Sequence, residues 1–407
     1  MPTALLVLPT TAYRVSDYLD AAAALGVEVA VASEEDQALA DQMGERFLRI
    51  DLGRPEWSAD RIVERSHTQS IDAIVPVDDQ GVLVAALAAR RLGLAHNPPD
   101  AVALTRNKAG MRRAMQREGV PQPDFRVLGG GDDPVALAVE LGLPVVLKPL
   151  SLNASRGVIR VDDTAAVTAT AERVRRIVAV AGGNPQEPIL VEKYVAGHEV
   201  AVEGLLRRGE LEALAVFDKP DPLEGPYFEE TMFVTPSRLH PEVIDELLTV
   251  TLTAVGALGL LEGPIHAELR VDGSVVRLIE VAARPIGGLC ARSLRFGMMG
   301  TTLEALLLRH ALDLPEAGVH RSLHAAGVLM IKIPQAGRLL GVDGVDEALS
   351  VEGITGVELS VSHGTYLLPV PEGGRYLGFV FASATEPGDV ETALRRADAL
   401  LTVRMEG

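Results

Sequence analysis

The chain has 407 residues, of which 47% are hydrophobic, and a formal net charge of −18 at pH 7. Its length exceeds one compact core, so we expect about two to four domains, and the acidic balance excludes a general affinity for nucleic acid. The single cysteine, Cys290, excludes an intramolecular disulfide. With neither a basic leader nor an apolar segment of membrane length, we expect a cytoplasmic protein that does not enter a membrane.

The amino-terminal part repeats a strand–helix–strand pattern. Apolar runs at 4–8 and 27–32 surround a helical segment, and a second helix, strand and helix follow up to residue 91. Unbroken apolar strands are typical of a parallel sheet covered on both faces. Asp78 and Asp79 follow a strand at the edge where open α/β sheets bind ligands, although helix capping explains them equally well. No G-x-G-x-x-G follows the first strand, so a dinucleotide cofactor is not expected.

A second region indicates anion binding. Lys108 opens a helix that runs to residue 118, and a short apolar strand at 144–149 ends on Lys148 between prolines. The segment Ser151–Val158 follows at once. Its small residues let backbone N–H groups approach an anion, and its hydroxyls and the lysines add donors. From these residues alone, a plain turn is an equally good interpretation.

The middle of the chain predicts strands and a long loop. After helices at 134–141 and 164–181, strands at 189–195 and 200–206 meet at a turn between Glu192 and Glu199, and a further strand spans 211–218. The proline-rich residues 219–236 lack helical periodicity. A structureless segment of that length is usually a lid or a binding loop.

A hairpin follows the helix at 241–258 and carries Glu268 and Glu280. A two-residue Asp-Gly turn would place Glu268 opposite Arg277 and point Glu280 away. A three-residue loop at 271–273 would place both glutamates on one face, with Cα atoms about 8 Å apart. We predict the three-residue loop, because two carboxylates at that separation can hold one or two Mg²⁺ ions. An ordinary solvated hairpin is the alternative.

The remaining segments alternate like a small antiparallel sheet, with strands at 328–333, 357–362 and 376–383 and an amphipathic helix at 389–401. We expect this part to complete the fold or to form the face of a homodimer.

The order of these features resembles the ATP-grasp superfamily over nearly the whole chain, and most of all its L-amino acid ligase and carboxylate–amine ligase branch. The resemblance is carried by Arg106-Asn-Lys108, Val145–Pro149, Ser151–Val158, Val191–Val195 with Glu199, and Glu268 with Glu280-Val-Ala-Ala-Arg284. It implies an α/β and α+β architecture in four parts. These are a Rossmann-like domain at 1–105, a small lid at 106–190, a central antiparallel-sheet domain with metal and substrate loops at 191–320, and an α+β domain at 321–407.

The resemblance also implies roles for individual residues. ATP would lie between the lid and the central domain, and Mg²⁺, or Mn²⁺ in its place, would bind Glu268 and Glu280. Arg284 and Lys148 would be catalytic. The other ATP contacts would be Lys108, Ser151, Ser155, Gly157, Glu192, Tyr194, Val195 and Glu199, and the substrate contacts would be Glu230, His266, Arg284, Gly287 and Gly288. For His266 a structural, hydrogen-bonded role is preferred to that of a base.

The activity implied is ATP-dependent ligation of small-molecule substrates, in which a carboxylate forms an acylphosphate and an amine then displaces phosphate. Two alternatives stay open: a glycinamide ribonucleotide synthetase-like or formyl-transferring enzyme, and a nucleotide-binding regulatory protein without turnover. The acidic loop favours an amino acid whose ammonium group meets Glu224, Glu229 or Glu230. One position departs from the family pattern, because Ala282 replaces the usual asparagine and offers no ligand atom to a second ion.

Overall fold

The amino-terminal lobe is a parallel sheet, as predicted. The computed structural model describes residues 1–35, 44–297, 300–315, 321–322 and 324–406, and in the first of its sheets the strand order is β3-β2-β1-β4. Alternate residues of β1 face opposite layers: Leu5 and Val7 pack with α3 and α4, and Leu6 packs with α1 and α10. The elements are β1 (Thr3–Val7), α1 (Val15–Leu25), β2 (Glu28–Ser33), η1 (Gly44–Arg46), β3 (Phe47–Arg49), α3 (Pro55–Ser66), β4 (Ala73–Pro76), η2 (Asp79–Gly81) and α4 (Val82–Leu92). The short β3 was not predicted.

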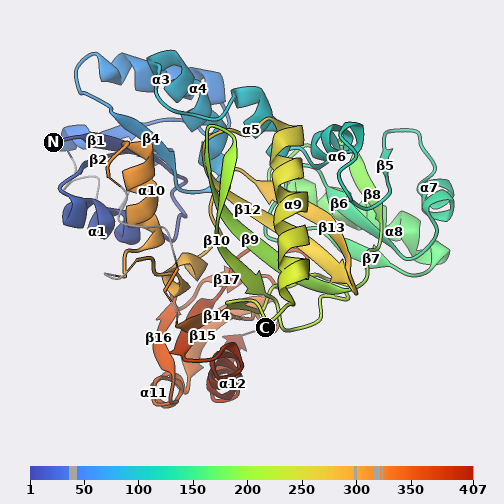
Figure 1. The fold of residues 1–407 in the computed structure, drawn as a ribbon. Helices are drawn as coiled ribbons and strands as arrows, with labels where there is room; N and C mark the ends of the chain where they lie inside the picture. Colours follow the sequence, from blue (N-terminus) through green and yellow to red (C-terminus); the bar gives the residue numbers. More distant parts are fainter. Residues whose placement is uncertain (36–43, 298–299, 316–320, 323, 407) are drawn as a thin grey trace.

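The lid is a second, antiparallel sheet of order β5-β8-β6-β7, covered by α7 and α8. It lies at the opposite end of the molecule from the amino-terminal lobe (Figure 1). The helix predicted to open at Lys108 is α6, whose first turn is capped by Asn107. The elements are α5 (Pro99–Thr105), α6 (Lys108–Arg117), β5 (Phe125–Leu128), α7 (Pro134–Leu141), β6 (Val145–Pro149), β7 (Ile159–Val161), α8 (Thr164–Val180) and β8 (Ile189–Lys193).

The strands that we expected to meet at a turn between Glu192 and Glu199 belong to different sheets. β8 lies between β5 and β6 in the lid sheet, whereas β9 lies in the central sheet. β8 therefore crosses the boundary predicted between residues 190 and 191, and Glu199 lies inside β9 (His198–Arg207). The two glutamates consequently reach the centre of the molecule from two lobes.

The central sheet is antiparallel and has the order β13-β12-β9-β10-β11-β14-β18-β16 within the described residues. The long helix α9 lies across its β9, β12 and β13 end (Figure 1). Its elements and those that flank it are β10 (Glu210–Asp218), β11 (Met232–Thr235), α9 (Pro241–Leu258), β12 (Gly263–Asp272), β13 (Val275–Ala282), η3 (Cys290–Ser293), α10 (Leu303–Ala311), β14 (Ala325–Ile331), β16 (Ile354–Leu359) and β18 (Gly378–Ala384).

Two predictions about this region were wrong. The segment 219–236 is not structureless throughout, because its apolar end forms β11, which pairs with β10 and β14. The strands near the carboxyl end do not make a small sheet of their own, because β14, β18 and β16 extend the central sheet. A separate small sheet exists but has the order β17-β15-β19. It contains β15 (Gly337–Asp343), β17 (Tyr366–Leu367) and β19 (Thr402–Glu406). The helix α11 (Val345–Leu349) packs on β16, and α12 (Pro387–Asp398) packs on β14 and β18 of the central sheet.

The β12–β13 hairpin brings Glu268 opposite Glu280, although the predicted three-residue loop was wrong. Asp272 pairs with Val275, so the turn consists of Gly273 and Ser274. With that turn alone, Glu268 would face Ile279. The register instead shifts between Glu268 and Leu269, so that Ile279 is an extra residue on β13. This β-bulge, and not the loop length, puts the two carboxylates on one face.

The bulge is held from outside the hairpin. Arg112 of α6 donates to the carbonyl oxygens of Leu278 and Ile279, at 3.4 and 2.6 Å, and the Leu278 N–H donates to the Pro121 carbonyl at 2.9 Å. The extra residue leaves backbone groups outside the ladder, and these contacts satisfy them.

Among the described residues, no helix is both long and apolar enough to cross a bilayer.

Candidate active site

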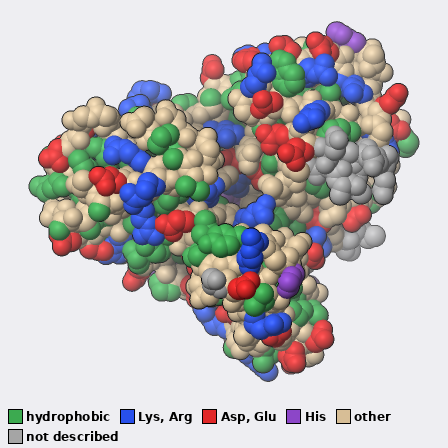
Figure 2. All heavy atoms as spheres, turned by 180° about the vertical axis from the view of Figure 1, so that it is seen from behind, with side chains coloured by type: hydrophobic (Ala, Val, Ile, Leu, Met, Phe, Trp, Pro, Cys, Tyr) green, Lys and Arg blue, Asp and Glu red, His purple; other side chains and the backbone are tan. Residues whose placement is uncertain are grey.

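A cavity of about 270 Å³ lies where the amino-terminal lobe, the lid and the central sheet meet. Figure 2 shows a hollow between the lobes with Lys and Arg side chains on its walls. Most residues that the sequence suggested line the cavity: Lys108, Lys148, Ser155, Glu192, Tyr194, Val195, Glu199, Glu230, His266, Glu268, Glu280, Arg284, Gly287 and Gly288.

Two suggested phosphate-loop residues do not line this cavity. The hydroxyl of Ser151 donates to the Glu187 carboxylate at 2.9 Å. Gly157 has φ +69° and donates its N–H to the carbonyl of Pro371 at 2.9 Å, so it turns the loop and attaches it to the carboxyl-terminal part. Both residues therefore hold the loop in place through contacts outside the cavity.

Buried cations converge on the lid side of the cavity. Glu192 is 2% exposed, and its carboxylate accepts from Arg112 Nε at 2.5 Å and pairs with Lys148 Nζ at 2.6 Å. Burial alone would raise the pKa of Glu192, but the two cations lower it to about 2. The carboxylate of Glu192, which we predicted to lie beside adenine, is thus engaged in ion pairs with Arg112 and Lys148. Arg112 was missed, although it lies one helical turn after Lys108 on the same face of α6.

Lys108 connects the lid loop to the β12–β13 hairpin. Its Nζ donates to the carbonyl of Leu152 in the lid loop at 2.9 Å and to Glu280 Oε1 at 3.1 Å. The ammonium group therefore lies between the loop that the sequence predicts for phosphates and one of the two suggested metal ligands.

A cluster of carboxylates surrounds one lysine on the central sheet. Lys219 Nζ lies 2.7 Å from Glu199, 2.7 Å from Glu230 and 3.0 Å from Glu268. Burial alone would lower the pKa of Lys219, but the three carboxylates raise it well above its usual value. Burial likewise opposes ionisation of Glu268, yet Lys219 and His266 hold its pKa well below the usual range. Lys219 was not identified from the sequence.

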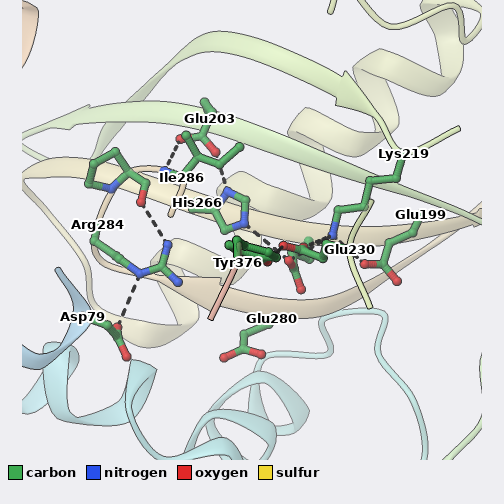
Figure 3. A network of polar contacts seen from close by, with 12 residues as sticks. Asp79, Glu199, Glu203, Lys219, Glu230, His266, Glu280, Arg284, Ile286 and Tyr376 are labelled. Carbon is green, nitrogen blue, oxygen red and sulfur yellow. Dashed lines mark hydrogen bonds and ion pairs between the residues drawn. The ribbon is translucent and has the colours of Figure 1, made fainter. Parts of the chain in front are cut away.

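His266 lies between the carboxylates of Glu203 and Glu268, and Figure 3 shows its contact with Glu203. Its Nδ1 contacts Glu203 at very short range, and its Nε2 lies 3.4 Å from Glu268. Burial lowers the pKa of the imidazole, but Glu203 outweighs burial and raises it to about 9. The raised pKa favours the protonated imidazole, which can donate to both carboxylates. The structural role stays a prediction.

The loop that follows Arg284 is held from both sides. Glu203 accepts from the N–H of Ile286 at 2.9 Å, and Arg14 donates to the Ile286 carbonyl at 3.0 Å. Arg14 in turn is paired with Glu304 in the protein interior. The backbone before Gly287 is consequently fixed between two buried charged side chains, neither of which the sequence indicated.

Arg284 itself faces the acids of the amino-terminal lobe. Its Nε lies 3.7 Å from Asp79 (Figure 3), and although burial lowers the pKa of Arg284, Asp79 and Asp78 raise it. Asp78 caps η2 by accepting from the N–H of Gln80, and both aspartates line the cavity. For Asp78 the two interpretations from the sequence are therefore compatible.

The acids considered for a substrate ammonium group are not equivalent. Glu230 lines the cavity but already accepts from Lys219 and from the hydroxyl of Tyr376, at 2.8 Å. Glu224 and Glu229 are not among the residues that line it. Cys290 is buried, and burial raises the pKa of its thiol, which disfavours the nucleophilic thiolate.

Ala282 occupies the place expected from strand parity. It lies opposite His266 in the β12–β13 ladder, lines the cavity and is 6% exposed. A methyl group thus lies where the family pattern has the amide oxygen of an asparagine.

Comparison with known proteins agrees with this geometry. The ATP-grasp N-terminal domain model matches residues 19–96, the ATP-grasp domain model matches residues 141–293, and the L-amino acid ligase C-terminal domain 2 model matches residues 329–406. The crystal structure of an L-amino acid ligase from Bacillus licheniformis superposes with a TM-score of 0.81 at 25% identity, covering 100% of both chains.

Curated relatives point the same way. Alanine–anticapsin ligase of Bacillus subtilis is 28% identical over 65% of this chain and 60% of its own length, and carnosine synthase 1 of Mus musculus is 26% identical over 70% of this chain and 36% of its own. The match thus spans less than two thirds of these two relatives. With all three domain models in the expected order and one fold throughout, the chain belongs to the ATP-grasp superfamily, in its L-amino acid ligase branch.

Proposed function

We propose that the chain is an ATP-dependent ligase that joins the carboxylate of one small molecule to the amine of another, with an amino acid as at least one substrate. The observation that carries this proposal is the convergence, in one cavity, of Lys108, Lys148 and Arg284 with the facing carboxylates of Glu268 and Glu280. Phosphoryl transfer needs positioning and charge neutralisation more than a protein nucleophile, and this set of side chains supplies both.

The donor set fits a hard divalent cation. Glu268 and Glu280 face each other across the hairpin, and both offer oxygen atoms, the ligands that Mg²⁺ and Mn²⁺ prefer. Glu280 keeps a partly exposed side chain, so it can exchange its contact with Lys108 for an ion. Bound there, Mg²⁺ would neutralise phosphate charge and orient the phosphate oxygens.

The protein residues would divide the reaction between them. Lys108 and Lys148 bind the phosphates of ATP while a substrate carboxylate oxygen attacks the γ-phosphorus. The bond from that phosphorus to the bridging oxygen breaks, giving an acylphosphate and ADP. The amine then attacks the acyl carbon, inorganic phosphate leaves, and the nitrogen loses a proton. Arg284 lies where it can stabilise the anionic groups of both steps.

Amino acid substrates are favoured by two observations. The carboxyl-terminal domain matches that of L-amino acid ligases, and the relatives include an alanine–anticapsin ligase. Asp78 and Asp79 also line the cavity, so carboxylates are available to an ammonium group there.

The test is ADP release with ATP and Mg²⁺ against pairs of amino acids, with mass spectrometry of any amide product. We expect stimulation by at least one pair, and loss of about a hundredfold or more in Glu280→Ala without a change in melting temperature. Exposed Glu212 on β10 provides the control, because Glu212→Ala removes a glutamate from the same sheet away from the cavity. A chain that never releases ADP in a substrate-dependent way is not a ligase.

A further inference from the structure

One segment of the carboxyl-terminal part reaches both the lid and the cavity. Residues 369–376, called the strap here, connect β17 to β18 and form neither helix nor strand. The strap makes a tight turn in which Gly373 donates its N–H to the Pro369 carbonyl at 2.8 Å. Its two ends contact different parts of the molecule.

The first half of the strap binds the lid. The Pro371 carbonyl accepts from the N–H of Gly157 at 2.9 Å, and the Glu372 carbonyl accepts from Arg156 Nε at 3.3 Å. The Glu372 carboxylate pairs with Arg173 of α8 at 2.7 Å. A Cβ atom at Gly374 would overlap the Arg156 side chain, so the two segments are in close contact. The strap thus holds the loop predicted to fold over the phosphates.

The second half of the strap forms cavity wall. Gly374, Arg375 and Tyr376 line the cavity, and the Tyr376 hydroxyl donates to Glu230 at 2.8 Å. Glu230 contacts Lys219, which contacts Glu268. Consecutive residues therefore link the lid loop to the carboxylate cluster, with no more than two peptide bonds between Gly374 and Tyr376.

The lid has a second attachment that shares one residue with the first. Arg173 Nη1 donates to the Tyr227 hydroxyl at 2.7 Å, while its Nε donates to Glu372. Arg173 is thus the lid residue that contacts both the strap and the loop that contains Tyr227. An interaction placed this way is sensitive to displacement of either segment.

We propose that the strap couples closure of the lid over the nucleotide to completion of the substrate pocket, and that Glu372 is the positioning residue for this coupling. The inference rests on the proposed function for its consequence in catalysis. Its structural content is separate, because the contact of Glu372 with Arg173 can be tested without turnover. Rigid attachment of a mobile lid favours the closed arrangement and so raises affinity for what the lid covers.

The test is a charge exchange. In Glu372→Arg two guanidinium groups face each other, and we expect faster amide hydrogen exchange across residues 151–158 and an ATP dissociation constant about five to ten times higher. The double variant Arg173→Glu with Glu372→Arg restores the opposite charges and should return both quantities to within about twofold of the wild type. Equilibrium titration with MgATP supplies the affinity.

A change at the other end of the strap tests the coupling. Tyr376→Phe removes only the hydrogen bond to Glu230, yet we expect exchange across residues 151–158 to rise by about twofold. The control is Glu140→Arg, which disrupts the Arg126–Glu140 pair within the lid and should alter neither measurement. Unchanged exchange and ATP affinity in Glu372→Arg, or failure of the double variant to restore them, would overturn the proposal. Because neither readout needs turnover, a negative ligase screen leaves this test intact.

Discussion

Two buried ionic clusters face each other across the cavity and have opposite compositions. On the lid side one carboxylate, Glu192, is shared by two cations, Arg112 and Lys148. On the central sheet one ammonium group, Lys219, is shared by three carboxylates. Glu192 is almost fully sealed at 2% side-chain exposure, whereas Glu230 and Glu268 keep 21%.

The difference shows how one cavity can receive both partners of a metal–nucleotide complex. Removing charges from water is costly, so a cluster with unequal numbers of charges gains from binding the missing sign. The lid side has a surplus of positive charge, which suits phosphates. The central side has a surplus of carboxylates, which suits cations. The same rule thus predicts opposite ligands for the two walls of the cavity.

The largest expected effect breaks the lid-side cluster. Glu192→Gln leaves Arg112 and Lys148 without their buried counter-charge, and we expect a loss of about 3–5 kcal/mol in unfolding free energy at pH 7. Chemical denaturation measures it. Glu140→Gln, which removes a carboxylate from an exposed ion pair of the same lid, should leave the unfolding free energy nearly unchanged.

The difference in unfolding free energy between the wild type and Glu192→Gln should decrease as the pH is lowered. The pKa of Glu192 is lowered from 4.5 to about 2 in the folded chain, so its stabilisation is complete above pH 4.5 and disappears as the pH falls towards 2. Denaturation curves of both proteins between pH 6 and pH 3 test this. A difference that stays constant throughout would show that Glu192 acts through packing and not through its charge.

The next effect breaks the opposite cluster. Lys219→Met keeps the length of the side chain but removes the cation that three carboxylates share, and we expect a loss of about 3 kcal/mol at pH 7. Glu199 keeps its contact with Arg270 and Glu268 keeps that with His266, so the loss falls mainly on Glu230. Burial already raises the pKa of Glu230, and removing Lys219 removes the cation that lowers it, so the variant should regain stability as the pH falls from 7 to 5. Exposed Lys332 supplies the control Lys332→Met. Equal losses at both pH values would contradict the electrostatic explanation.

The smallest expected effect concerns the Mg²⁺ requirement and a single ligand atom at position 282. Ala282→Asn adds an amide oxygen to the carboxylate wall, and we expect the Mg²⁺ concentration for half-maximal ADP release to fall by about threefold to tenfold. Ala282→Leu adds similar bulk without a ligand atom and should not lower it. If both variants respond alike, position 282 acts by its size.

The sequence alone predicted a large part of the architecture. The helices at 134–141 and 241–258 have the bounds expected, because prolines at their first positions and glycines after their ends mark them locally. The ATP-grasp family was also predicted from the order of short motifs and is confirmed by the domain models. The roles of the individual site residues stay predictions.

Other features depend on contacts that no local pattern carries. Lys219 lies 11 to 49 residues from its three partners, so nothing near it in the chain marks it as the centre of a cluster. Tyr376 of the strap lies 146 residues from Glu230 in sequence. The strand β11 inside the long loop was not predicted, because its partner strand β14 is remote in sequence.

The hairpin separates the two sources of information most clearly. The sequence by itself determined that Glu268 and Glu280 lie on neighbouring strands beside Arg284, because turn residues and strand alternation are local properties. Only the tertiary structure decided that the two carboxylates face each other. That register depends on the extra residue Ile279, and the bulge is stabilised by Arg112 and by the backbone of Pro121, both of which reach the hairpin from the α6 region.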